Sequence, residues 1–286
     1  MKTEKATFTG ADGQQLAAEL DLPPGPPRAV ALFAHCFSCG KDLKSARRLT
    51  TRLTDRGFAV MRFDFTGLGS SEGDFADTNF SSNVADLLAA ADWLRQTYSA
   101  PSLLIGHSLG GAAVIAAAAH IPELTAVATV GAPADPGHVA HLFSCALDEI
   151  EENGHADVSI AGRTFTVKKQ FLDDIAGIQL DEALAALDIP LLVMHAPEDT
   201  IVSIDNAQKI FGAALHPKSF VALDGADHLM SEPAQAEYAA EVLATWADRY
   251  VPTHLAASDD VIVSASEGKV VVAERGTGKF AQVIRV

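Results

Sequence analysis

The chain has 286 residues, of which 48% are apolar and 20% are charged, so it can bury a large core and has the composition of a soluble globular protein. Its 37 acidic and 21 basic residues give a net charge of −16, which argues against nucleic acid or an anionic membrane as a partner. The first residues lack the apolar core of a signal peptide, no apolar run is long enough to cross a membrane, and three cysteines do not suggest a disulfide framework. We therefore expect a cytoplasmic protein.

Strands and helices are predicted to alternate along most of the chain. Two strands near 3–10 and 14–22 flank the turn Asp12-Gly13 and precede a proline-rich connection. Continuous apolar strands then alternate with amphipathic helices, which is typical of a mostly parallel sheet covered by helices on both faces. The expected strands are 29–34, 58–65, 102–105, 125–131, 190–195 and 219–223, and the expected helices are 45–56, 84–98, 112–119, 204–215 and 233–249.

The pattern G-x-S-x-G, which marks many serine nucleophiles, occurs twice in this chain. At 106–110 it follows an apolar strand and precedes a run of strong helix formers, which is the strand–turn–helix context of a nucleophile elbow. At 69–73 it follows a glycine-rich stretch and precedes loop residues, so we expect Ser71 to lie in a surface turn. Ser108 is therefore the candidate nucleophile.

A serine nucleophile requires a histidine base and an acid that orients it, and after an elbow of this kind the chain order is serine, acid, histidine. Among the ten histidines, His228 lies between the last predicted strand of the sheet and the final helix. Asp199 follows the penultimate strand, at the same sheet edge as Ser108, and its neighbour Glu198 is the competing acid. His107 adjoins the nucleophile, and we expect it to pack under the elbow.

An oxyanion formed during acyl transfer needs preorganised N–H donors. We expect one donor to be the backbone of Leu109, directly after the nucleophile, and the other to be Phe37, with Cys36 close behind it, in the loop after the first parallel strand. Cys36 and Cys39 form C-x-x-C, a redox motif in other folds. In this loop we interpret them as structural or incidental cysteines.

The segment from about 132 to 188 interrupts the alternation of strands and helices. It contains a predicted helix at 139–152 and two short alternating stretches. Because it follows the strand after the elbow helix, it should form a small cap over the carboxyl edge of the sheet. Its aromatic side chains are candidates for an acyl or aromatic pocket, although any one of them could serve only to pack the insertion: Phe143, Phe165 and Phe171.

The last residues differ in character from the rest of the chain. We assign 1–253 to one domain and 254–286 to a linker and β tail, with strands expected at 261–263, 269–273 and 280–286. Exposed strands of this kind offer an edge to another chain, so a homodimer formed through the tail is one expectation.

Taken together, these motifs resemble the α/β-hydrolase superfamily, in its serine-hydrolase branch, over about 5–251. The stretch 34–42, followed by a β tail, looks like the hydrolase half of bifunctional α/β-hydrolase–OsmC proteins. In that interpretation 269–286 matches the first strands of an OsmC-like domain. Because the tail contains no cysteine, the thiol peroxidase activity that OsmC implies cannot belong to this chain. The sequence departs from the superfamily at Cys36, where many members carry His-Gly.

The motifs predict a serine hydrolase of the carboxylesterase type. Ser108 would form an acyl-enzyme, His228 would act as the base and Asp199 would orient it. The short insertion favours small to medium acyl esters. No cysteine–histidine cluster with zinc spacing and no phosphate-binding glycine loop is recognisable, so we expect neither a metal nor a cofactor. Thioester or peptide hydrolysis by the same triad, or a non-catalytic partner of a redox domain, are the alternatives.

Overall fold

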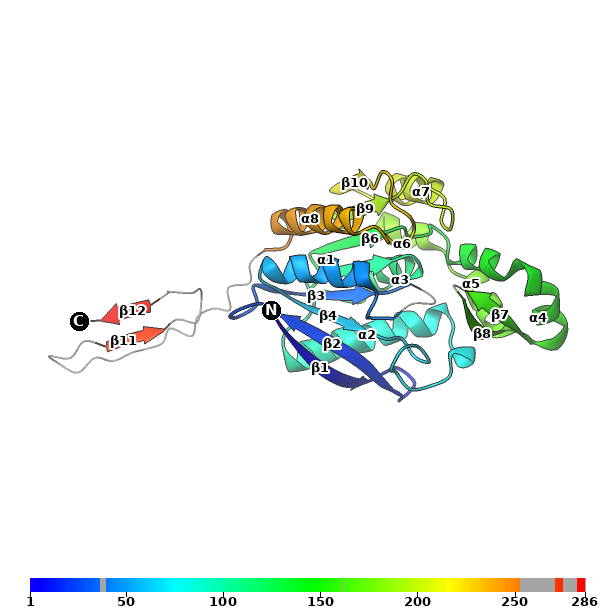
Figure 1. The fold of residues 1–286 in the computed structure, drawn as a ribbon, viewed down its shortest axis with the longest axis horizontal. Helices are drawn as coiled ribbons and strands as arrows, with labels where there is room; N and C mark the ends of the chain where they lie inside the picture. Colours follow the sequence, from blue (N-terminus) through cyan, green and yellow to red (C-terminus); the bar gives the residue numbers. More distant parts are fainter. Residues whose placement is uncertain (37–39, 161, 253–270, 275–281, 286) are drawn as a thin grey trace.

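The computed structural model describes residues 1–36, 40–160, 162–252, 271–274 and 282–285. Its centre is an eight-stranded sheet in the order β1-β2-β4-β3-β5-β6-β9-β10 (Figure 1). Only β1–β2 and β2–β4 pair antiparallel, and the other neighbours are parallel. The strands are β1 Lys2–Thr9, β2 Gln15–Leu22, β3 Ala29–Ala34, β4 Phe58–Phe63, β5 Leu103–His107, β6 Ala126–Val130, β9 Leu191–His195 and β10 Lys218–Ala222.

Helices cover both faces of this sheet, as the continuous apolar strands predict. In β3, Val30 and Leu32 belong to the core on one face, whereas Ala31 and Phe33 belong to the core on the other. Successive strand side chains point to opposite faces, so a strand buried on both sides must be apolar throughout. The first core packs under α2 Phe80–Thr97, α3 Leu109–Ala118 and α7 Asp205–Ala213, and the second packs under α1 Lys44–Asp55 and α8 Pro233–Tyr250.

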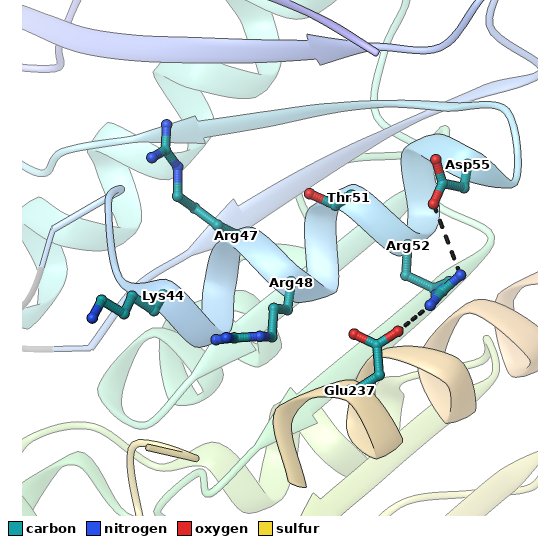
Figure 2. Close-up of a pocket in the computed structure, with 7 residues that line it drawn as sticks. All are labelled: Lys44, Arg47, Arg48, Thr51, Arg52, Asp55 and Glu237. Carbon is teal, nitrogen blue, oxygen red and sulfur yellow. Dashed lines mark hydrogen bonds and ion pairs between the residues drawn. The ribbon is translucent and has the colours of Figure 1, made fainter. Parts of the chain in front are cut away.

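Ion pairs fasten α1 to α8 on the second face. Arg52 of α1 lies between Asp55 of its own helix and Glu237 of α8 (Figure 2). Its Nε lies 3.0 Å from Glu241 Oε1, one turn further along α8. These ion pairs join the two helices that cover this face of the sheet.

The predicted cap is present as an inserted subdomain beyond the carboxyl ends of the parallel strands (Figure 1). Its hairpin pairs antiparallel and forms a separate two-stranded sheet. The elements are the 3-10 helix η2 Pro136–Ala146, α4 Leu147–Asn153, β7 His155–Ile160, β8 Arg163–Lys168, α5 Lys169–Ala176 and α6 Leu180–Ala186.

The single helix predicted at 139–152 is wrong in its detail. The structure has two helices that meet at Leu147, and the first is kinked at Phe143, with φ −130° and ψ 28°. Phe143 is fully buried there, with its ring 6.2 Å from that of Phe171. Tertiary packing has overridden the local helical periodicity, which is a weak preference.

The tail forms a short hairpin where it is described. β11 Val271–Glu274 and β12 Gln282–Arg285 pair antiparallel in a two-stranded sheet of their own. The strand predicted at 261–263 lies outside the described residues. The division at residue 253, the OsmC-like interpretation of the tail and dimerisation through it stay predictions. Across the described part of the chain, none of the helices combines the length and hydropathy that a membrane crossing requires.

Candidate active site

Ser108 lies between the end of β5 at His107 and the start of α3 at Leu109. Its φ is 56°, a region that is rare for residues with a Cβ and common at strained functional turns. The flanking glycines allow the turn, because a Cβ on Gly106 would lie 2.2 Å from the carbonyl oxygen of Gly110. The turn is anchored to the sheet by Ser108 N–H, which donates to Val130 O over 2.9 Å.

The two residues predicted as partners of Ser108 lie beside it. The Oγ of Ser108 is 2.9 Å from Nε2 of His228, and Nδ1 of that ring is 2.7 Å from Oδ2 of Asp199. A carboxylate only accepts hydrogen bonds, so Nδ1 carries the proton and Nε2 is left to accept the serine hydroxyl. This tautomer is the one that a histidine base requires.

Asp199 is almost completely buried, and both of its carboxylate oxygens accept hydrogen bonds. The side chain of Asp199 is 1% exposed, and its Oδ1 accepts the backbone N–H of Ile201 and Val202 over 2.8 and 2.9 Å. Burial raises the pKa of Asp199, but the hydrogen bonds from His228 and from these two amides outweigh it, so the pKa lies below its ordinary value. Asp199 is thus held as a carboxylate against His228.

The competing acid Glu198, and Asp227 beside His228 in the chain, both hydrogen-bond to backbone groups instead. Glu198 accepts the backbone N–H of Gly225 over 3.3 Å, and Asp227 accepts that of Ser231 over 2.7 Å. Both contacts shape the loop that carries His228 without touching its ring nitrogens. The structure therefore favours Asp199 over Glu198 as the acid beside His228.

Two further histidines support the loops of the site. His107 packs under the elbow, as expected, and its Nε2 donates to the carbonyl of His228 over 2.7 Å. His195, which the sequence analysis did not select, ends β9 and its Nε2 donates to Val202 O over 2.8 Å. Burial lowers the pKa of both, to about 3 for His107, so both are neutral. A histidine at the last position of a strand that leads into the acid loop was the available signal for His195.

The structure describes one of the two expected oxyanion donors. Leu109 is the first residue of α3 and is buried, which puts its N–H at the helix N-terminus directly after the nucleophile. Phe37 lies outside the described residues. Cys36, the residue before it, is 5% exposed and disulfide-bonded, a bond that the odd number of cysteines gave no reason to expect.

Ser71, the other serine in a G-x-S-x-G match, is committed to the backbone. Its Oγ donates to Asp64 O over 2.5 Å and accepts the N–H of Ala17 over 2.9 Å. The side chain of Asp64 in turn accepts Lys41 N–H over 2.7 Å and the Lys41 ammonium over 2.8 Å. Ser71 thus fixes the turn after β4, against which the end of the oxyanion loop is held.

The aromatic residues proposed for the acyl pocket are buried in the cap. Phe143 and Phe171 pack edge to face, and Phe165 lies 4.8 Å from Phe75. Their exposed fractions are 0%, 2% and 6% for Phe143, Phe171 and Phe165. A role for any of them in substrate binding stays a prediction.

A cavity of about 340 Å³ lies beside α1, which packs on the face of the sheet opposite to α2 and α3. Figure 2 shows the residues that line it. It is lined by the basic face of α1, including Lys44 and Arg48, and by Glu237 of α8. It contains none of the Ser108, His228 or Asp199 side chains. Among the described residues, no group of three or more metal-ligating side chains is assembled anywhere.

Comparisons with known proteins bear on the fold and the family of this chain. A family model described as serine aminopeptidase, S33 (Hydrolase_4), matches residues 25–152. The crystal structure of the esterase domain from a Rhodothermus marinus protein is 48% identical, with a TM-score of 0.73, over 87% of this chain and 99% of that one. The chain belongs to the α/β-hydrolase superfamily. The predicted fold class is therefore confirmed.

Other α/β-hydrolases similar to this chain act on esters and thioesters according to their names. Human monoglyceride lipase is 27% identical over 252 residues, which cover 78% of this chain and 82% of the lipase. The mitochondrial palmitoyl-protein thioesterase ABHD10 of Rattus norvegicus is 28% identical over 186 residues, which cover 62% of this chain and 61% of that protein. This α/β-hydrolase is accordingly an esterase-like hydrolase.

Proposed function

We propose that the protein is a serine carboxylesterase that cleaves small to medium acyl esters through an acyl-enzyme on Ser108. The observation that carries the proposal is the continuous hydrogen-bonded series from Ser108 through His228 to Asp199. A serine hydroxyl is a weak nucleophile, and a neutral imidazole that accepts its proton is the usual means of activating it. The elbow supplies the serine at the edge of the sheet, where a substrate can reach it.

The geometry supports the following sequence of steps. Nε2 of His228 removes the hydroxyl proton while Oγ of Ser108 attacks the ester carbonyl, and Asp199 stabilises the imidazolium that results. In this proposal the oxyanion is stabilised by the two donors predicted from the sequence, the N–H groups of Leu109 and Phe37. His228 then gives the proton to the leaving alcohol, and a water molecule, activated by the same histidine, hydrolyses the acyl-enzyme.

The same residues could cleave a thioester or an amide, and the thioesterase among the relatives keeps the thioester alternative open. A comparison of kcat/KM across matched ester, thioester and aminoacyl-amide series separates these substrates, because kcat/KM ratios measure transition-state discrimination. We expect the ester series to be preferred.

The proposal is tested with p-nitrophenyl acetate and the Ser108→Ala variant. Loss of the nucleophile should lower kcat/KM by about 10⁴-fold or more, since a triad acts as a unit. Circular dichroism of both proteins controls for folding. Full turnover by folded Ser108→Ala would show that the nucleophile has been assigned wrongly.

A further inference from the structure

Two asparagines of equal burial differ in how their side chains are used. Asn83 in α2 and Asn206 in α7 are each 8% exposed. The carboxamide of Asn206 accepts Ala134 N–H over 3.0 Å and donates to Ser203 O over 2.9 Å. The carboxamide of Asn83 makes no hydrogen bond to any residue that the structure describes, whereas its backbone N–H donates to Asn79 O.

The side-chain oxygen and nitrogen of Asn83 are not among the fully enclosed polar atoms that lack a partner in the described part of the chain, so water or a ligand can reach this carboxamide and hydrogen-bond to it. The same face of α2 carries the apolar Phe80 and Leu87. It also carries Asp86, whose carboxylate accepts the N–H and the hydroxyl of Thr66 over 3.1 and 2.7 Å. The environment of α2 therefore satisfies Asp86 and leaves Asn83 with spare hydrogen-bonding capacity.

Asn83 lines a small cavity of about 10 Å³, which is room for one water molecule or one group of that size. Its apolar walls include Phe65, Leu68 and Leu109. His35 also lines it, but Nδ1 of His35 donates to Cys36 O over 2.7 Å and its Nε2 accepts Phe65 N–H over 3.4 Å. Among the described lining residues, the carboxamide of Asn83 is the polar side-chain group left to bind an occupant.

The cavity adjoins the place where the substrate carbonyl would be held. Leu109 lines it and directly follows Ser108, and Cys36, which also lines it, directly precedes Phe37. Leu109 is one of the two predicted oxyanion donors, and Cys36 is the chain neighbour of the other. The acyl carbon next to the carbonyl is the part of the substrate nearest to that point, so a small substituent on this carbon can enter the cavity.

We propose that Asn83 is a specificity-determining residue that binds a hydroxyl group on the acyl carbon next to the ester carbonyl. The preferred substrates are then esters of short 2-hydroxy acids, an inference that rests on the proposed esterase function. A carboxamide both donates and accepts, as a hydroxyl does, so the two groups are complementary. No charged residue lines the described cavity, which disfavours a carboxylate or an ammonium group there, and its volume admits one heavy atom.

The test compares two esters that differ by one group, ethyl glycolate and ethyl propionate, in which a methyl replaces the hydroxyl. Ethanol release that depends on Ser108 is measured for each, and kcat/KM is normalised to the rate with hydroxide to remove intrinsic reactivity. The wild-type protein should prefer glycolate by about 10-fold or more, because one hydrogen bond separates the two transition states. Asn83→Leu should bring the ratio close to one.

Melting temperatures show whether a change in the activity of Asn83→Leu comes from a loss of folding. Asn83→Leu removes a carboxamide with no protein partner, so it should melt at or above the wild-type temperature. The matched variant Asn206→Leu breaks two hydrogen bonds and should melt lower. A normalised wild-type ratio near one, or an unchanged ratio in Asn83→Leu, would overturn this inference alone and leave the cavity with an ordered water only. Absence of Ser108-dependent hydrolysis of both esters would overturn the proposed function as well.

Discussion

The two G-x-S-x-G segments of this chain share a pattern and differ in everything around it. Ser108 has a positive φ at a strand–helix turn, and its hydroxyl faces the imidazole of His228. Ser71 is not among the residues with positive φ, and its hydroxyl bridges Asp64 O and Ala17 N–H. The first hydroxyl is paired with a group that can take its proton, whereas the second is paired with backbone groups that cannot.

The difference shows that the partners of a serine, rather than the motif, determine its chemistry. Backbone partners turn the Ser71 hydroxyl into a structural link between β2 and the end of β4. The histidine partner makes the Ser108 hydroxyl a candidate nucleophile. The predictions below test this contrast.

The largest effect is expected when Asp199, the acid that is hydrogen-bonded to His228, is replaced. Asp199→Asn should lower kcat by about 10⁴-fold, because an amide no longer holds the His228 tautomer that leaves Nε2 free to accept. The matched control is Glu198→Gln, next to it in the chain, which should keep the wild-type kcat. Steady-state kinetics on one ester checks both, and an equal loss in the two variants would remove the distinction between Asp199 and its neighbour.

The stability of the folded protein should also depend on pH through His107, the residue before Ser108. The pKa of His107 is lowered by burial to about 3 in the folded protein, against about 6.5 in the unfolded chain. Its contribution to stability is therefore complete above pH 6.5 and is lost as the pH falls toward 3, because only the unfolded chain then binds the proton. We expect this group to lower the free energy of unfolding by about 1.4 kcal/mol for each unit by which the pH falls below 6.

Urea unfolding at several pH values measures that slope in the wild-type protein and in His107→Asn. Between pH 6 and 4.5 the unfolding free energy of the variant should depend less steeply on pH, by the amount that corresponds to the uptake of about one proton on unfolding. Identical slopes would contradict the assignment of His107 as a buried neutral group beside the nucleophile.

The smallest expected effect concerns Ser71. Ser71→Ala removes two hydrogen bonds of a half-buried hydroxyl and should lower the free energy of unfolding by about 1–2 kcal/mol. The turnover of the folded variant should be that of the wild-type protein. A loss of turnover without a loss of stability would assign Ser71 a chemical role and erase the contrast with Ser108.

The sheet and the triad candidates were predictable because their signals are local. Apolar runs located β6 and β9 within about a residue of their observed bounds, since a strand buried on both faces is apolar throughout. Chain order and the carboxyl edge of the sheet were enough to select Asp199 and His228. These inferences need no knowledge of tertiary packing.

Features that depend on tertiary packing were not predictable. The kink at Phe143 arises where its ring packs against Phe171, on another helix. The unpaired state of Asn83 depends on what α2, α3 and the loop after β3 place around it. Each needs positions that only the folded chain defines.

The central claim is that Ser108, rather than Ser71, is the residue that becomes acylated. Treatment with a fluorophosphonate probe, followed by proteolysis and mass spectrometry, locates the modified serine directly. We predict a single adduct on the peptide that contains Ser108, which is lost in His228→Ala because the nucleophile then lacks its base. An unlabelled protein, as expected of a non-catalytic module, or an adduct on the peptide that contains Ser71 would contradict the claim.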